Sequence, residues 1–153
     1  MYGAMKLMIS KELNDLFYLC SLIEFIGRKT KNSGTQIVNI LGEDELRHIL
    51  KYADVFHCER IEEVADRYIE DFNISVGTYN KVIEAKDNYP SYWDLGKIYM
   101  RLIRDVTKGD LIKTMIEVYN SWIVEYIENY NIAFYYMSPA YISACYREEK
   151  ILD

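Results

Sequence analysis

Residues 61–72 read IEEVADRYIEDF, and this stretch decides the fold class. Its apolar side chains recur at intervals of three and four residues, and charged side chains occupy most of the positions between them. This spacing places one apolar stripe along a helix of 3.6 residues per turn, so the stretch predicts an amphipathic α-helix with one buried face. The stripe consists of Ile61, Val64, Ala65, Tyr68, Ile69 and Phe72.

The same periodicity recurs along most of the 153-residue chain. It predicts helices over about residues 11–31, 37–41, 43–53, 61–72, 91–108 and 111–131, and a last one after Pro139. We therefore expect an all-α, compact bundle of about six or seven helices in a single domain, residues 1–153. Asparagine, glycine and proline punctuate residues 73–90, which we interpret as a connector between the halves 1–72 and 91–153. The connector is long enough to hold a short helical turn or extended pieces of its own.

Short polar residues mark where several helices begin. Ser33 or Thr35 is expected to cap a short helix that Gly42 stops, and Ser91 with Asp94 resembles a capping box. Asp110 is expected to cap the longest helix, residues 111–131. Ser138-Pro139 predicts the start of the last helix, because proline is favoured at the first helical position.

The net charge of −6 is concentrated in the middle of the chain, where residues 43–90 contain six Lys or Arg and twelve Asp or Glu. An acidic surface argues against binding to a nucleic-acid backbone, which requires a basic stripe. It suits a basic protein partner, although a solvated helix face explains it equally simply. We predict Glu62, Glu63 and Glu70 as the acidic part of a partner-binding surface.

The chain contains 15 tyrosines, several of them near the C-terminus. Tyrosine suits both the boundary of a core and an interface, because its ring is apolar and its hydroxyl is polar. Consecutive aromatic residues at a helix end cannot all face one core. We therefore expect at least one exposed ring there and predict Tyr135, Tyr136 and Tyr141 as partner-binding residues, with packing against the first helix as the alternative.

The three cysteines, Cys20, Cys58 and Cys145, are odd in number and far apart, which favours reduced thiols over a disulfide framework. No apolar run approaches the roughly 18 residues of a membrane span. We expect a cytoplasmic protein that does not contact a membrane.

Two pairs combine a carboxylate with a histidine three residues later: Glu45 with His48, and Asp54 with His57. Such pairs serve as ligands in di-iron bundles, but there they lie on different facing helices. Here both pairs lie on one continuous segment, so they are weak metal candidates, and we predict no cofactor. The chain has no phosphate-binding loop, nucleophile elbow or zinc motif, so we expect no enzyme. Acid–base catalysis by carboxylates alone would leave no such motif.

The segment Ile37 to Asp71, with its pattern Tyr52-x-Asp54-Val55-Phe56-His57, resembles a small uncharacterised helical family of Firmicute gut bacteria. Longer hypothetical proteins of the same bacteria have a segment similar to Ser91–Lys97. Genes of that kind resemble parts of toxin–antitoxin-like loci, so the resemblance implies an antitoxin-like or accessory role. The family has no established activity, and no functional residue is carried over from it. Cys58 stands where that pattern has threonine or serine.

These patterns lead to one leading hypothesis and two alternatives. The leading hypothesis is a helical protein–protein interaction module that binds an unidentified protein through its acidic middle and tyrosine-rich end. The first alternative is a small metal- or ligand-binding domain or enzyme that uses His48, His57 and nearby carboxylates. The second is a structural homodimer that closes on its aromatic surface.

Overall fold

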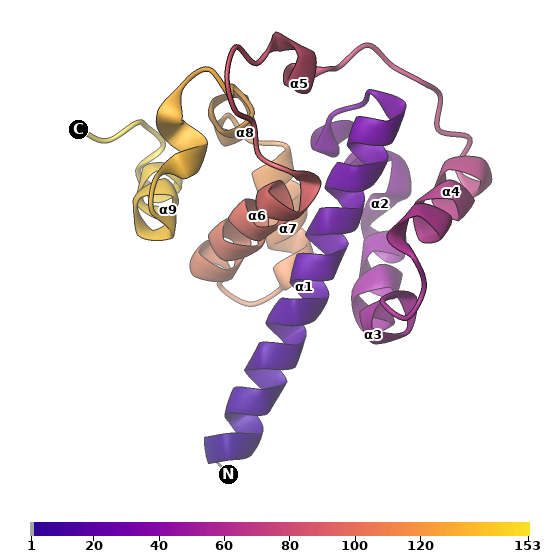
Figure 1. Cartoon of the computed structure of the whole chain (residues 1–153). Coiled ribbons are helices and arrows are strands. Elements are labelled where there is room, and N and C mark those ends of the chain that lie inside the picture. Colours follow the sequence, from indigo (N-terminus) through magenta and orange to yellow (C-terminus); the bar gives the residue numbers. More distant parts are fainter. Residues whose placement is uncertain (1) are drawn as a thin grey trace.

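The computed structural model describes the backbone of residues 2–153 and the side chains of residues 11–153. In this range all regular secondary structure is helical, and no strand is present (Figure 1). Six of its nine α-helices have seven or more residues. The predicted all-α bundle is therefore confirmed.

In chain order the elements are α1 (Tyr2–Thr30), α2 (Gly34–Lys51), α3 (Ala53–Phe56), α4 (Ile61–Asp71), α5 (Lys81–Glu84), α6 (Tyr92–Val106), α7 (Leu111–Tyr119), α8 (Ile123–Ile127), the 3₁₀-helix η1 (Ala133–Tyr136) and α9 (Pro139–Glu148).

Helix α1 is the central element, and the rest of the bundle is arranged around it. It packs against α6 and α2 most extensively and also touches α3 and α4, and α2 in turn packs against α7. Figure 1 shows α2, α3 and α4 on one side of α1, with α6 to α9 on the other. Leu16, Leu19, Ile23 and Ile26 of α1 are completely buried, each contributing about 1.5–3 kcal/mol of hydrophobic stabilisation. The two predicted halves thus share one core.

Most of the predicted helix starts are confirmed. The Ser33 hydroxyl accepts from the Gln36 amide and the Gln36 side chain accepts from the Ser33 amide, which completes a capping box at α2. Ser91 and Asp94 form the same arrangement at α6. Ser138, the residue before Pro139, caps α9, and its hydroxyl accepts a hydrogen bond from the Tyr141 amide. These caps satisfy amide donors that have no partner within the helix.

The predicted break at Gly42 is also found, although the helix resumes directly after it. Gly42 has φ 82° and ψ 169°, a conformation that residues with a side chain rarely adopt. The two segments on either side of this kink together make up α2.

Three predicted boundaries are wrong. The first helix begins at Tyr2 rather than near residue 11, and this makes α1 the longest helix. Residues 54–56, which lie outside the expected helices, belong to the short helix α3, and the helix expected over 43–53 ends at Lys51. The helix expected over 111–131 is divided into α7, α8 and η1.

The division of 111–131 has a local physical cause at residues 120 and 121. The Asn120 side-chain amide donates to the Ile116 carbonyl at 2.8 Å, and the Ser121 hydroxyl donates to the Val118 carbonyl at 2.7 Å. The Val118 carbonyl thus accepts from the Ser121 amide and hydroxyl rather than from the Trp122 amide, which would continue the helix. Asn120 also exchanges two hydrogen bonds with Asn39 of α2, at 2.9 and 3.0 Å, so a tertiary contact holds the break in place.

The connector 73–90 crosses one end of α1 between α4 and α6 and contains the single turn α5 (Figure 1). Of the two alternatives expected for the connector, it contains the short helical turn. The three cysteines are free thiols: Cys20 and Cys145 are buried, and Cys58 is exposed. Within the described residues, no helix combines the length and the apolar character that crossing a bilayer requires.

Candidate functional site: a cavity between two buried glutamates

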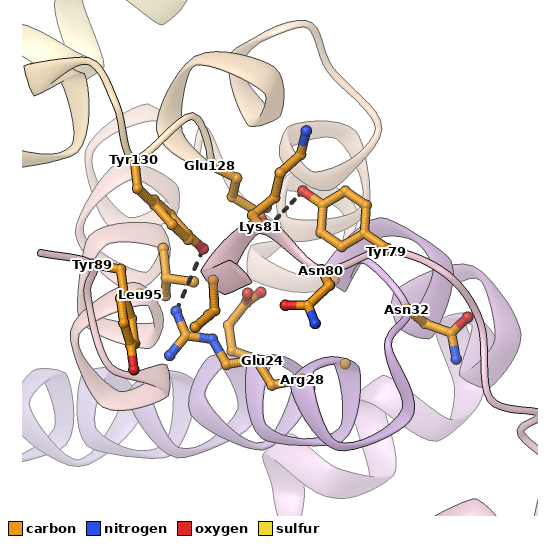
Figure 2. A pocket seen from close by; sticks show the side chains of 13 residues that line it. Glu24, Arg28, Asn32, Tyr79, Asn80, Lys81, Tyr89, Leu95, Glu128 and Tyr130 are labelled. Atoms are coloured by element: carbon orange, nitrogen blue, oxygen red, sulfur yellow. Dashed lines mark hydrogen bonds between the residues drawn. The ribbon is translucent and has the colours of Figure 1, made fainter. Parts of the chain in front are cut away.

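A cavity of about 320 Å³ lies where the connector crosses the end of α1. Helix α1 contributes two charged side chains, the connector contributes five residues, and the segment after α8 contributes Glu128 and Tyr130 (Figure 2). The lining consists of Glu24, Gly27, Arg28, Asn32, Gly34, Tyr79, Asn80, Lys81, Val82, Tyr89, Leu95, Glu128 and Tyr130. Its size falls within the range typical of sites for small organic ligands.

Glu24 is the first buried carboxylate of this site and is only 3% exposed. It lies on the core-facing side of α1, and its Oε2 accepts a hydrogen bond from the Tyr119 hydroxyl at 3.0 Å. Gly34, at the start of α2, makes this position possible, because a Cβ there would lie 2.4 Å from the same oxygen. Among the described residues, no donor reaches the other oxygen, Oε1. The Glu24 carboxylate thus lines the cavity with half of its hydrogen-bonding capacity unused.

Glu128 is the second buried carboxylate and is 2% exposed. It terminates α8, and each of its oxygens has a phenol partner. The Tyr79 hydroxyl donates to Oε1 at 3.0 Å, and the Tyr99 hydroxyl donates to Oε2 at 2.6 Å. Both oxygens of Glu128 are therefore satisfied within the protein, in contrast to those of Glu24.

Two stacked tyrosines connect the carboxylates. The rings of Tyr99 and Tyr119 are fully buried and lie 4.3 Å apart at an interplanar angle of 24°. Each donates its hydroxyl to a different glutamate, Tyr99 to Glu128 and Tyr119 to Glu24. Helix α6 thereby holds the Glu128 carboxylate in place, and helix α7 holds that of Glu24.

Burial in the core raises the pKa of both carboxyl groups. For Glu24, desolvation raises the pKa most and the charge of Glu128 raises it further, whereas the Tyr119 hydrogen bond and Arg28 oppose the rise. For Glu128, desolvation again dominates, and the hydrogen bonds from Tyr99 and Tyr79 partly offset it. Carboxyl groups in such surroundings take up and release protons at a higher pH than exposed ones do.

Arg28 supplies the positive charge closest to this pair along α1. Its guanidinium lies 5.8 Å from the centre of the Tyr89 ring and 5.9 Å from that of Tyr130. It donates to the Pro90 carbonyl and, at 3.4 Å, to the Tyr130 hydroxyl, as Figure 2 shows for the latter. In the described part of the chain, no ion pair joins Arg28 to either glutamate. The guanidinium therefore only partly offsets their charge.

The connector forms the outer wall of the cavity and is held by hydrogen bonds on both sides. The Gly77 amide donates to the Thr30 carbonyl at 2.7 Å, and the Tyr79 amide donates to the Lys31 carbonyl at 2.9 Å. Further along, Asn131 accepts from the Lys86 amide at 2.8 Å and donates to the Glu84 carbonyl at 3.0 Å. This segment, expected only to join two halves, thus builds part of the candidate site.

A second cavity of about 560 Å³ adjoins the first and shares several of its lining residues with it. The shared residues are Tyr79, Lys81, Glu128 and Tyr130. The Glu128 carboxylate and the Tyr79 ring therefore border both spaces.

The predicted acidic residues lie elsewhere, on α4. Glu63 and Glu70 are exposed and Glu62 is partly exposed, so all three are accessible to a partner, and their role stays a prediction. None of them lines the cavity between Glu24 and Glu128.

The predicted aromatic residues form a different surface. Tyr135 is buried, Tyr141 is partly buried, and Tyr136 is 64% exposed, so the expectation of at least one exposed ring is confirmed. Tyr135 and Tyr136 stack at 4.1 Å and line a groove of about 220 Å³ together with Met137 and Ile142. A partner-binding role for this groove stays a prediction.

The predicted carboxylate–histidine pairs have other contacts. Glu45 accepts a hydrogen bond from the Tyr68 hydroxyl at 2.6 Å, His48 packs against Tyr52, and His57 stacks on Tyr18 at 5.5 Å. Among the described residues, no three His, Cys, Asp or Glu side chains are grouped so that they could hold a metal ion.

Neither Glu24 nor Glu128 was predicted as a site residue, although the sequence carries a signal for both. Glu24 is the only charged residue in the run Leu16–Gly27, and it falls on the same helix face as Cys20. Glu128 likewise lies one helical turn after the apolar Val124. A carboxylate within an apolar stripe is costly to bury and therefore indicates a partner or a functional site.

No protein-family model, curated protein or solved structure matches this chain. The candidate site therefore rests on its own geometry.

Proposed function

We propose that this protein binds a small polar organic molecule in the cavity between Glu24 and Glu128. The observation that carries the proposal is the Glu24 carboxylate, which is buried beside a cavity and has one oxygen without a donor. The open oxygen faces the cavity, and a hydrogen bond to a charged group contributes about 1.5–3 kcal/mol. A ligand donor at Oε1 would make such a bond.

Three further features support a ligand site rather than a purely structural network. The cavity volume suits a small molecule, its lining combines aromatic rings with a few fixed polar groups, and it contains two carboxyl groups with a raised pKa. The proposal retains the ligand-binding alternative inferred from the sequence but moves it from His48 and His57 to Glu24 and Glu128.

Thermal unfolding in the presence of a mixed panel of small amines, acids, alcohols and sugars tests this proposal. A ligand at one hundred times its dissociation constant stabilises the folded state by about 2.7 kcal/mol, which raises Tm by roughly 5–10 °C for a domain of this size. Glu24→Gln keeps the shape of the side chain and should change the Tm shift that the ligand causes. Glu63→Gln, an exposed glutamate on α4, is the matched control and should respond as the wild type does. If no member of the panel shifts Tm, the proposal is wrong.

A second candidate function is the protein–protein interaction role, in the antitoxin-like or accessory form that the resemblance implies. It is supported by the exposed Tyr136 and Met137 beside the groove between α6 and α9. Tyr136→Ser removes the exposed ring and should weaken capture of a partner from lysate. Tyr126 is an exposed tyrosine outside the groove, so Tyr126→Ser should leave capture unchanged. Equal capture by both variants would place the interface elsewhere, and a concentration-dependent mass would identify the partner as a second copy.

A further inference from the structure

We infer that the ligand of the Glu24–Glu128 cavity is an organic cation whose ammonium or guanidinium group donates to the open oxygen of Glu24. The inference rests on the proposed function, which requires only that some small molecule binds there. It names the chemical class of that molecule.

The charges around the cavity form the first argument. Glu24 and Glu128 are almost completely buried, whereas Arg28 is partly exposed and already donates to Pro90 and Tyr130. Lys81 is 39% exposed and pairs with Glu84 at 3.3 Å, so the charge of Glu84 offsets its own. Both cations line the cavity and favour the ionised form of Glu128, but among the described residues neither forms an ion pair with Glu24 or Glu128. When both carboxyl groups are ionised, the most deeply buried charges of the site are therefore negative. A bound cation compensates these charges directly.

The aromatic walls form the second argument. Tyr79, Tyr89 and Tyr130 line the cavity, and each already accommodates a cationic group. The Lys81 ammonium lies 5.6 Å from the Tyr79 ring centre, and Arg28 lies within 6 Å of both other rings. The faces of phenol rings are electron-rich and attract ammonium and guanidinium groups. Walls of this kind combined with a buried carboxylate are a recurring solution for binding organic cations.

The competing ligand classes fit less well. An anionic ligand would add negative charge beside two buried carboxylates, which repel it at close range. A neutral alcohol or sugar could donate a hydrogen bond to Glu24 but would leave the buried charge of its carboxylate uncompensated. The ionic partner predicted by the geometry is therefore positive.

The release of a proton on binding further distinguishes a cationic ligand from the other ligand classes. The titratable and charged groups around Glu24 are Cys20 and Arg28 of α1, Tyr79 of the connector, Tyr99 of α6, Tyr119 of α7 and, after α8, Glu128 and Tyr130. Burial and Glu128 raise the pKa of Glu24, so its carboxyl group holds a proton over part of the range in which an exposed glutamate is ionised. A cation requires the ionised form. Its affinity should therefore rise with pH, by up to about tenfold for each pH unit below that pKa, and binding should release a proton.

The test uses four probes of matched length on the full chain: butylamine, 1,4-diaminobutane, butanol and butyrate. Isothermal titration at about pH 6 and about pH 8, in two buffers of different ionisation enthalpy, measures affinity and proton release together. We expect the amines to bind at least about tenfold more tightly than butanol or butyrate, with the preference growing as pH rises. Glu24→Gln should lower amine affinity about tenfold or more, and Glu63→Gln should leave it unchanged.

A second variant keeps the test decisive if Glu24→Gln folds poorly. Tyr89 is half exposed at the edge of the cavity, so Tyr89→Leu removes an aromatic face with little risk to the core. It should weaken amine binding several-fold, and the exposed Tyr136→Leu serves as its control.

The outcomes separate the two claims. If butanol or butyrate binds as tightly as the amines and Glu24→Gln alters that binding, the cavity is a ligand site but the cationic class is wrong. Amine affinity that is independent of pH and of Glu24 overturns the inference as well. If none of the probes binds and the wider thermal panel is also silent, the proposed function itself fails.

Discussion

Glu24→Gln should stabilise the empty protein at neutral and alkaline pH. The substitution keeps the size and shape of the side chain, and the amide oxygen can still accept the hydrogen bond from Tyr119. It removes a carboxylate that is buried and has one oxygen without a donor. The negative charge of Glu128 also raises the pKa of this carboxyl group. Removing such a charge should raise the free energy of unfolding by about 1–3 kcal/mol at about pH 8.

The pH dependence has a definite sign. A carboxyl group whose pKa is higher in the folded state than in the unfolded state binds its proton more tightly when folded. Its contribution is therefore most favourable below the ordinary pKa of glutamate and is lost as pH rises through the raised pKa of the folded protein. Because the pKa of Glu24 is raised, wild-type stability should fall over this window, and Glu24→Gln should reduce that fall. At about pH 4, where the carboxyl group is protonated, wild type and variant should be nearly equal.

Urea unfolding at several pH values, followed by circular dichroism, measures this difference directly. Glu63→Gln, at an exposed position, controls for the change in net charge and should leave the pH profile unaltered. The slope m should be the same for all three proteins, because the surface exposed on unfolding does not change. A Glu24→Gln protein that is less stable than the wild type at about pH 8, with the same pH profile, would show that Glu24 is ionised and fully compensated in the folded state.

Three further predictions concern the supports of the site. Tyr99→Phe removes the donor 2.6 Å from Glu128 and should lower the free energy of unfolding by about 1.5–3 kcal/mol, whereas the exposed Tyr136→Phe should change it by less than about 0.5 kcal/mol, both measured by urea unfolding. Gly34→Ala places a Cβ 2.4 Å from the Glu24 carboxylate and 2.7 Å from the Tyr119 ring. Thermal unfolding should therefore show that the free energy of unfolding falls by about 1–3 kcal/mol. Unchanged stability would mean that the neighbouring side chains move aside freely. Ser91→Ala removes the cap of α6 and should cost about 1 kcal/mol without altering ligand binding, and Ser91→Asp should restore most of that loss.

The helices themselves were largely predictable because their determinants are local. The apolar stripe of residues 61–72 became α4, with Val64 and Ala65 completely buried. Ser33, Ser91 and Ser138 cap the helices that follow them, because a hydroxyl two or three residues before an unpaired amide reaches it in almost any fold. Where a tertiary contact competes with helix propagation, as between Asn120 and Asn39, the local pattern predicted the wrong boundary.

The candidate site was not predictable in the same way. Its parts come from α1, the connector and the segment after α8, which are far apart in the sequence and meet only when the bundle forms. The residues selected for their chemistry, His48 and His57, are exposed and pack against aromatic rings. Glu24 and Glu128 resembled ordinary helix glutamates except for their apolar neighbours, and only burial changes what a carboxylate can do.

The amino-acid sequence by itself determined that this chain is helical, where most of its helices begin, and that an acidic face lies on α4. These properties follow from hydrogen bonding and side-chain periodicity within a few residues. Only the tertiary structure decided that two glutamates 104 positions apart share a core, that Tyr99 and Tyr119 stack between them, and that the connector encloses a cavity beside them. Electrostatic free energy depends on distance and on exclusion of water, and neither is defined until the chain has folded.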